Sequence, residues 1–346
     1  MLFYILIFLA AFFLTLVFTW LIEKIAFKLK IVDRPDAARK IHKEQTPLLG
    51  GLAIFLGFFL ILFFVRENLI TGILTYRHWL WFFFGACFLI IGGILDDKYN
   101  LKPGRQIIWP LLAIACVIFG GIGIGKITNP LGGFLYFSGI TSLIFTVVWL
   151  LAMMYTTKLL DGLDGLVSGI SGIGGLIIFL FTISAKYYQP DIALAALIFA
   201  AACLGFLILN WHPAKIFLGE GGSLLLGYIL GVLAIISGGK IAIALLVLGL
   251  PLLDFGWTIL RRLAVGKNPL RFADRKHLHH RLLDIGLGQR RTVLIFYAFS
   301  IFFGLAGLFL QSKGKLLAVL SLFLIMVCLL VGLEILEKKR SLKNNL

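Results

Sequence analysis

Long apolar runs separated by short polar segments dominate the hydropathy pattern of this chain. Several runs contain about 18 or more apolar residues, enough for a helix to cross the hydrocarbon core of a bilayer. The pattern predicts about eleven membrane-spanning helices, near residues 1–22, 48–65, 79–95, 106–122, 138–156, 165–185, 192–210, 222–236, 241–260, 293–310 and 315–335. We therefore expect an all-α polytopic membrane protein, a helical bundle in which residues 1–346 form one integral-membrane domain.

Composition strengthens this prediction. Hydrophobic residues make up 60% of the 346 positions and charged residues only 14%, with a mean hydropathy of +1.03. Soluble domains carry about 25% charged residues, so the composition excludes an ordinary soluble protein. The net charge of +16 comes without a soluble basic face, and a nucleic-acid partner is therefore not expected.

The basic residues predict an orientation. Threading eleven spans places 25 of the 32 lysines and arginines on one side, mainly in the loops 23–47, 96–105 and 261–292 and in the C-terminal tail. Loops rich in Lys and Arg face the cytoplasm. We therefore expect a multi-pass protein of the cell membrane, with the N-terminus outside and the C-terminus in the cytoplasm.

Acidic residues gather on the same side. Asp96 and Asp97 end the third predicted span, and Asp161 and Asp164 follow the fifth at a spacing that predicts one shared helical face. Acids at membrane depth are costly and mark functional sites. An adjacent pair suits Mg²⁺ or a catalytic base, although a solvated span end would also explain either pair alone. We expect these carboxylates and Glu220 to converge on one cytoplasmic cleft.

Two further polar segments lie on this side. The glycine-rich turn 217–223 enters a span, and its Glu220 supplies a hard oxygen ligand for a metal ion. A histidine segment has side chains that can donate hydrogen bonds to a diphosphate: His277, His279, His280 and Arg281. Zinc is a poorer match because no fourth ligand accompanies them. Asp254, inside the ninth predicted span, is open to either structural pairing or membership of the cleft.

Read together, these segments resemble the polyprenyl-phosphate N-acetylhexosamine-1-phosphate transferases, glycosyltransferase family 4. The resemblance runs from about residue 39 to residue 287. It rests on Lys40-Ile41-His42, Pro47 to Gly51, Asp96-Asp97, Asp161-Gly-Leu-Asp164-Gly, Asn210 ten residues before Glu220, and His277-Leu-His-His280.

The resemblance implies a bundle of ten or eleven spans with a cytoplasmic active site. A polyprenyl phosphate in the membrane would attack the β-phosphate of a UDP-N-acetylhexosamine, giving polyprenyl-diphospho-sugar and UMP. Mg²⁺ is the implied cofactor, with Mn²⁺ as the alternative, and a homodimer is left open. The Arg39-Lys-Ile-His and His277-Leu-His-His segments are similar to the branch that uses UDP-GlcNAc. A phospho-MurNAc-pentapeptide transferase is the alternative within the family, and an ion-coupled transporter is the alternative outside it.

The resemblance also implies roles for individual residues. The expected catalytic residues are Asp96, Asp97, Asp161 and Asp164. The expected metal ligands are Glu220, Asp97 and Asp161. The expected substrate-binding residues are Lys43, Lys158, Asn210, His277, His279, His280 and Arg281.

Three positions depart from the family pattern. Lys158 and Tyr155 stand where the family usually has asparagines, and Glu220 stands where it usually has aspartate. Glutamate keeps the carboxylate but adds one methylene. Lysine brings a point charge that suits a phosphate. These changes touch the phosphate and metal region of the expected site.

Overall fold

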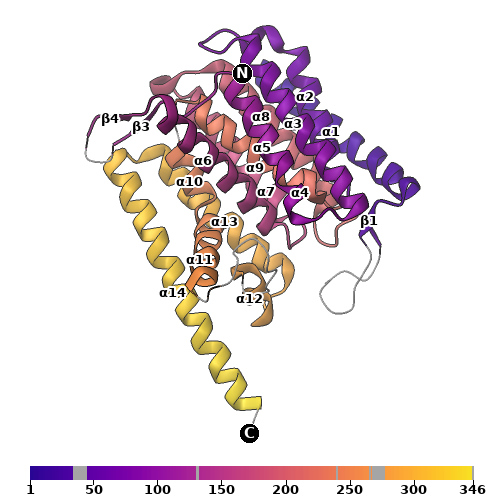
Figure 1. Ribbon diagram of the computed structural model, residues 1–346, viewed down its shortest axis with the longest axis vertical. Coiled ribbons are helices and arrows are strands. Elements are labelled where there is room, and N and C mark those ends of the chain that lie inside the picture. Colours follow the sequence, from indigo (N-terminus) through magenta and orange to yellow (C-terminus); the bar gives the residue numbers. More distant parts are fainter. Residues whose placement is uncertain (34–44, 130–131, 239–240, 265, 267–276, 345–346) are drawn as a thin grey trace.

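The protein is a bundle of α-helices in the computed structural model, which describes residues 1–33, 45–129, 132–238, 241–264, 266 and 277–344 (Figure 1). Its helices are α1 (Leu2–Leu29), α2 (Gly50–Phe64), α3 (Tyr76–Tyr99), α4 (Pro103–Gln106), α5 (Ile108–Phe119), α6 (Gly139–Leu160), α7 (Leu166–Ile183), α8 (Pro190–Asn210), α9 (Gly219–Ile236), α10 (Ile241–Val247), α11 (Gly249–Ala264), α12 (Leu278–Asp284), α13 (Gln289–Phe309) and α14 (Ser312–Asn344). Short 3₁₀ helices cover Arg66–Leu69 and Ala185–Tyr187.

Two short antiparallel hairpins complete the described residues. Strand β1 (Val32–Asp33) pairs with β2 (Thr46–Pro47), with Asp33 opposite Thr46. Strand β3 (Lys126–Thr128) pairs with β4 (Phe134–Tyr136). The all-α prediction holds for the architecture, because strands contribute only these connections.

Each of the eleven predicted spans coincides with helical structure. Among the described residues, eight helices are long and apolar enough to cross a membrane, whereas α2 and the segment Pro103–Phe119 are shorter. The ninth predicted span, 241–260, is not one straight helix: α10 and α11 meet at 84° and count as one further span only if taken together. The number of eleven crossings therefore stays a prediction.

Proline explains the break between α10 and α11. Pro251 has no backbone N–H and its ring clashes with the carbonyl four residues earlier, that of Val247. That carbonyl instead accepts a hydrogen bond from the Ser300 hydroxyl of α13, with an oxygen–oxygen distance of 2.8 Å. A side chain from a neighbouring helix thus satisfies the backbone group that the break releases.

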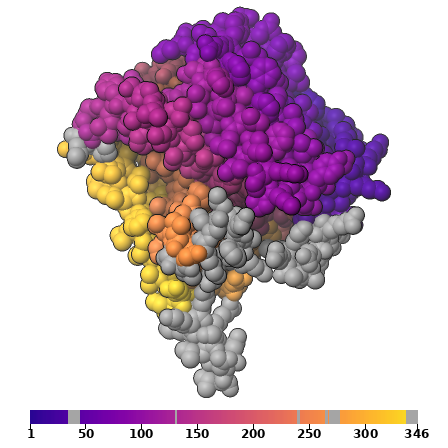
Figure 2. All heavy atoms as spheres, viewed as in Figure 1, coloured from indigo at the N-terminus to yellow at the C-terminus, as the bar shows by residue number. Residues whose placement is uncertain are grey.

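Helix α9 lies at the centre of the bundle (Figure 1). In the 18-residue apolar stretch of α9, 89% of the residues are buried, against 22% in the corresponding stretch of α1 and 28% in that of α14. Helix α14 runs along one edge and forms the yellow ridge in Figure 2. Apolar side chains on such outer helices suit contact with lipid tails, so burial distinguishes the protein core from the lipid-facing shell.

Glycines let α9 touch two neighbours backbone to backbone. A Cβ atom on Gly51 of α2 would overlap the backbone of Gly222, and one on Gly93 of α3 would overlap the backbone of Gly221. Small residues permit this close approach between membrane helices. Gly219 precedes these contacts with a φ of 73°, a left-handed conformation that glycine adopts readily. The start of α9 is therefore held directly against the start of α2 and the last turns of α3.

Candidate active site

A polar pocket of about 1480 Å³ opens at one end of the bundle, where α3, α6 and α8 end and α9 begins. Its described lining includes seven carboxylates, from Glu23, Asp33, Asp96, Asp97, Asp161, Asp164 and Glu220. The lining lysines among the described residues are Lys158 and Lys215. Although the whole chain is basic, the described lining of this pocket is acidic, so an anionic ligand would meet mainly carboxyl groups among the described residues.

Most of the residues expected from sequence line this one pocket. They are Asp96, Asp97, Lys158, Asp161, Asp164, Asn210, Glu220 and His280. The expected helical face shared by Asp161 and Asp164 is wrong, because α6 ends at Leu160 and α7 starts at Leu166. Both acids lie in the turn between these helices, where Gly165 takes a φ of 77°. The turn, rather than helical periodicity, brings both side chains to the pocket.

Asp96 is fixed by the reversal of the chain after α3. Asn100 ends the helix with a φ of 50°, and the following Leu101 N–H donates to Asp96 Oδ1 over 2.8 Å. Gln106 of α4 donates its side-chain amide to the same oxygen over 3.2 Å. These two hydrogen bonds hold a largely buried carboxylate at the pocket wall. Nothing in the apolar pattern identified Gln106 as part of the site.

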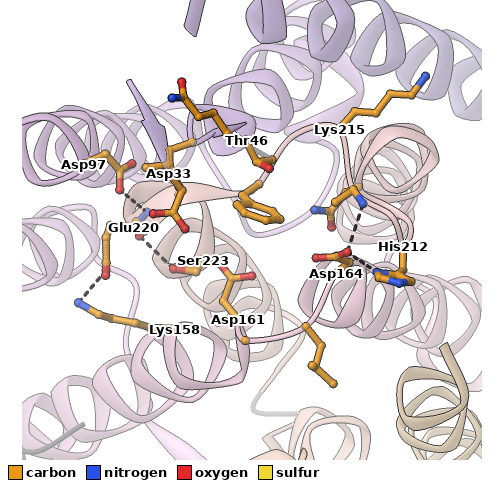
Figure 3. Close-up of a pocket in the computed structure, with 18 of the residues that line it drawn as sticks. Asp33, Thr46, Asp97, Lys158, Asp161, Asp164, His212, Lys215, Glu220 and Ser223 are labelled. Carbon is orange, nitrogen blue, oxygen red and sulfur yellow. Dashed lines mark hydrogen bonds and ion pairs between the residues drawn. The ribbon is translucent and has the colours of Figure 1, made fainter. Parts of the chain in front are cut away.

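Asp97, Glu220 and Lys158 form a connected group (Figure 3). The Glu220 backbone N–H, in the first turn of α9, donates to Asp97 Oδ1 over 3.1 Å. The Lys158 ammonium, in the last turn of α6, lies 2.7 Å from Glu220 Oε2. It also lies 3.4 Å from the amide oxygen of Gln106. Two of the residues that depart from the family pattern are thus partners of each other.

Asp161 lies between the two sides of the pocket (Figure 3). Its side chain is accessible from the pocket, but protein surrounds that space. This burial within the pocket walls, followed by repulsion from Glu220 and Asp164, raises the pKa of Asp161 to about 8. At neutral pH the carboxyl therefore holds a proton until a cation replaces it.

Asp164 is hydrogen-bonded to His212, a residue that we did not predict to be part of the site. Its Oδ2 lies 2.6 Å from Nδ1 of His212 and accepts the backbone N–H of Ala214 over 3.2 Å. Arg290 of α13 donates two hydrogen bonds to the His212 carbonyl oxygen. His212 lines the pocket. A histidine next to proline in a connecting segment had no sequence signal of its own, and only the fold pairs it with Asp164.

Asn210 connects the acidic turn to the segment that leads into α9. Its amide oxygen accepts hydrogen bonds from the Gly165 N–H and the Ser168 hydroxyl, and its amide nitrogen donates to the Ile216 carbonyl. The side chain is 4% exposed. Asn210 therefore positions the residues around it. Because it also lines the pocket, its expected contact with substrate stays a prediction.

The histidine segment is only partly at the pocket. Of its four expected ligand-binding residues, only His280 lines it. His277 Nδ1 lies 2.9 Å from Asp254 Oδ2, and the Leu278 N–H donates to the other oxygen of Asp254. Asp254 is thus a structural partner of His277, and that ring nitrogen is not available to a diphosphate.

His279 is buried beneath the acidic turn. It is 1% exposed, and a Cβ atom on Gly162 would lie 2.8 Å from its Nε2. Burial, then the neighbouring His280 and His277, holds the pKa of His279 well below its usual value. The ring is therefore neutral at pH 7 and packs under the turn. Arg281 does not line the pocket either, and Lys43 lies outside the described residues.

The pocket can be tested for the metal ion that the resemblance implies. Glu220, Asp97 and Asp161 supply hard oxygen donors, and the excess of carboxylates favours a divalent cation. Within the described part of the chain, however, no three His, Cys, Asp or Glu side chains are arranged to hold a metal ion. Glu220 faces Lys158 instead. The donor chemistry fits a divalent cation, and Lys158 is the group that competes with it.

Comparison with known proteins assigns the chain to a protein family. A model of glycosyl transferase family 4 matches residues 79–238. The chain is 32% identical over 326 residues, 92% of its length, to the probable undecaprenyl-phosphate N-acetylglucosaminyl 1-phosphate transferase of Bacillus subtilis, of which 88% is covered. The chain belongs to glycosyl transferase family 4. The family model spans α3 to α9, which carry both acid pairs, Lys158 and Glu220.

Other members of glycosyl transferase family 4 are similar over most of their length. The undecaprenyl-phosphate alpha-N-acetylglucosaminyl 1-phosphate transferase of Thermotoga maritima is 31% identical over 86% of this chain and 87% of its own. The decaprenyl-phosphate N-acetylglucosaminephosphotransferase of Mycolicibacterium smegmatis is 28% identical over 87% of this chain and 81% of its own. The family predicted from the motifs is confirmed.

Proposed function

We propose that this protein is an integral-membrane enzyme that transfers N-acetylglucosamine 1-phosphate from UDP-N-acetylglucosamine to a polyprenyl phosphate such as undecaprenyl phosphate. The products are polyprenyl-diphospho-N-acetylglucosamine and UMP. The observation that carries the proposal is the acidic pocket of about 1480 Å³ at one end of a membrane-spanning bundle, built from the family motifs. The names of the relatives in Bacillus, Thermotoga and Mycolicibacterium support the sugar and the lipid acceptor.

The position of the pocket suits two substrates that arrive from different phases. Its walls come from the ends of apolar helices, so a phosphate on a membrane-anchored chain can reach it. Apolar side chains such as Phe27, Leu48 and Leu101 also line it beside the carboxylates. A soluble nucleotide sugar enters the same space from the aqueous side. We place that side in the cytoplasm, because most lysines and arginines fall there.

The chemistry requires positioning and charge neutralisation more than covalent help from the protein. An oxygen of the lipid phosphate attacks the β-phosphorus of the nucleotide sugar, and the bond from that phosphorus to the bridging oxygen breaks. The electron pair leaves with UMP. In this proposal Asp96 and Asp97 receive or deprotonate the lipid phosphate. Asp161 lies at the reacting centre, and Asp164 acts by holding His212.

Positive charge must come with or to these anionic substrates. Mg²⁺, with Mn²⁺ as the alternative, would be held by Glu220, Asp97 and Asp161 and would neutralise the diphosphate when bound. Lys158 contributes a cation from the chain itself. The seven carboxyl groups and two lysines of the described lining favour such additional positive charge.

Two alternatives make different predictions. A phospho-MurNAc-pentapeptide transferase would use the same pocket with another donor, but the relatives reported above are named for N-acetylglucosamine. An ion-coupled transporter needs carboxylates near mid-bilayer that are reachable from both sides. Here Asp96, Asp161 and Glu220 lie at helix ends around one pocket.

The test is a direct transfer assay. Purified protein is incubated with undecaprenyl phosphate, MgCl₂ and one radiolabelled donor, either UDP-GlcNAc, UDP-GalNAc or UDP-MurNAc-pentapeptide. We expect label in the lipid extract, with stoichiometric release of UMP, from UDP-GlcNAc. Label from the pentapeptide donor instead would assign the other branch. Absence of lipid-linked label and of UMP with every donor would refute the proposed transfer.

A further inference from the structure

The ion pair between Lys158 and Glu220 is an unusual contact for a pocket that must take up anions. The ammonium lies 2.7 Å from Glu220 Oε2, and the side chains are 19% and 36% exposed. Partial removal from water makes such a contact stronger than a surface pair. It joins the last turn of α6 to the first turn of α9 across 62 positions of sequence. The pair therefore places the positively charged Lys158 against the carboxylate of Glu220 in the wall of the pocket.

The surroundings explain why the ammonium rests on Glu220. The Glu220 N–H donates a hydrogen bond to Asp97 Oδ1, so a second carboxyl group lies beside Glu220. Lys215, the other lysine of the described lining, lies on the opposite side of the close-up from Lys158 (Figure 3). Lys158 is thus the described lysine that offsets the charge of Glu220. Its second contact, with the Gln106 amide oxygen at 3.4 Å, also stabilises a cation in this place.

Both partners can separate without moving a helix. A lysine ammonium is a compact charge on a flexible four-carbon stem, and it makes no fixed bidentate contact. Glu220 is equally a side chain with rotatable bonds. A divalent cation would attract Glu220 more strongly than a single ammonium does, and a released ammonium inside an acidic pocket would seek an anion. A phosphate of the nucleotide sugar is the anion that the proposed function brings.

We propose that Lys158 is a resident counter-ion that Glu220 exchanges for the divalent cation when the nucleotide sugar binds, and that the freed ammonium then contacts a phosphate of that substrate. This inference rests on the proposed function. The exchange has a consequence that carboxylates alone would not produce. Metal and nucleotide increase each other's binding affinity, because each one takes up one partner of the ion pair. Such coupling is reciprocal between the two ligands.

The experiment measures Mn²⁺ binding rather than catalysis. Purified protein in detergent is titrated with Mn²⁺, and the loss of the free-ion electron paramagnetic resonance signal gives the affinity. Titrations run with and without UDP-GlcNAc, in the absence of lipid phosphate. For the wild type we expect UDP-GlcNAc to tighten Mn²⁺ binding by at least about fivefold, the lower end of common coupling strengths.

Substitution of Lys158 separates the exchange from simple electrostatics. Lys158→Met keeps the length of the side chain and removes the charge, so Mn²⁺ without nucleotide should bind at least about fivefold more tightly, and the coupling should disappear. Lys215→Met makes the same change of charge in the same pocket without breaking the ion pair. It should leave the coupling intact. Lys158→Arg should behave as the wild type without nucleotide, because it keeps the cation.

Each outcome decides the inference. Equal Mn²⁺ affinity in the wild type and Lys158→Met, or equal tightening in Lys158→Met and Lys215→Met, would overturn the exchange. Loss of coupling in Lys158→Arg as severe as in Lys158→Met would also overturn it. If Lys158→Met does not fold, Lys158→Gln carries the same expectation. A wild type that makes lipid-linked product but shows none of these effects refutes the exchange alone, whereas a wild type that makes no product refutes the proposed function.

Discussion

The imidazole of His212 and the carboxylate of Asp164 form a pair 2.6 Å apart, from Nδ1 to Oδ2. The pair joins the turn after α6 to the segment after α8, 48 positions apart in sequence. The Ala214 N–H donates to the same carboxylate oxygen, and Arg290 holds the His212 carbonyl. The carboxylate thereby fixes the orientation of the ring, and Nε2 has no hydrogen-bond partner among the described residues. That nitrogen is available to a ligand in the pocket.

We therefore expect His212→Phe to lower kcat/KM for UDP-GlcNAc by about 10- to 100-fold, because a hydrogen bond to a charged group contributes about 1.5–3 kcal/mol. Asp164→Asn should cost a similar amount by releasing the ring. The double variant should be no worse than either single one, since both changes remove the same interaction. Steady-state kinetics of all three variants check this, and additive losses would show that the two residues act separately.

Asp161 should make the stability of the protein depend on pH, and it should be necessary for activity. Its folded-state pKa of about 8 exceeds that of an unfolded aspartate, so its stabilising contribution is complete at low pH and is lost as pH rises through 8. Without divalent cations, the melting temperature of the wild type should fall between pH 6 and pH 9. Asp161→Asn should flatten that decline while reducing transfer by at least about 1000-fold, a loss of about 4 kcal/mol in transition-state stabilisation.

Melting curves in detergent with a chelator, at several pH values, test the first half of this prediction. The second half uses the transfer assay at saturating Mg²⁺. An Asp161→Asn protein with an unchanged pH decline would mean that other groups cause it. Full transfer activity would place the reacting centre away from Asp161.

The glycine contacts of α9 should resist even one added methyl group. Gly93→Ala puts a Cβ atom into the backbone of Gly221, and the overlap should cost about 1–3 kcal/mol. Relief of the overlap would also move Glu220 relative to Asp97, so transfer should fall further than the melting temperature indicates. Gly332→Ala on α14 is the matched control, because nothing lies within 4 Å of its added Cβ atom.

Thermal melting and transfer activity of the two alanine variants give the comparison. Gly332→Ala should keep or slightly raise the stability, since alanine favours a helix over glycine. Equal stability and activity in Gly93→Ala would mean that the helices adjust freely, and that the spacing of the acids does not depend on backbone contact.

Asp254 should hold the histidine segment at the bundle. Asp254→Ala removes the partner of His277 and of the Leu278 N–H at the start of α12. Loss of such a helix cap costs about 1 kcal/mol, which corresponds to about fivefold more local opening. Limited trypsin digestion followed by mass spectrometry should show cleavage after Arg281 accelerated by about that factor. Cleavage after Lys315 is the internal control, and equal acceleration at both sites would indicate global destabilisation.

The hydropathy pattern was sufficient to predict the helices, because apolar length is a local property. It located α3, α6 and α8 within a few residues. The order of the polar motifs, which is a separate property of the sequence, predicted the family. The bend between α10 and α11 was missed although Pro251 was visible, because hydropathy averages over the break. Asp161 and Asp164 reached the pocket through a turn that their spacing did not reveal.

A single sequence could not predict which side chains contact each other. Gln106 and His212 gain their places only when segments about 50 residues distant fold against Lys158 and Asp164. The pairing of Lys158 with Glu220 likewise depends on where α6 ends and α9 begins. The partners of His277 and Asn210 within the protein could not be predicted for the same reason, and the substrate-binding roles expected for both residues stay predictions.

The acidic lining of the pocket has a consequence for the design of inhibitors. A compound that imitates the nucleotide diphosphate arrives with negative charge and meets the seven carboxyl groups of the described lining, so accompanying cations favour its binding. A cationic amphiphile carries its own neutralising charge, and its hydrocarbon part suits the apolar side chains of Phe27 and Leu101 in the pocket lining. Screening without divalent ions would favour compounds of the second kind, and such conditions would miss the first.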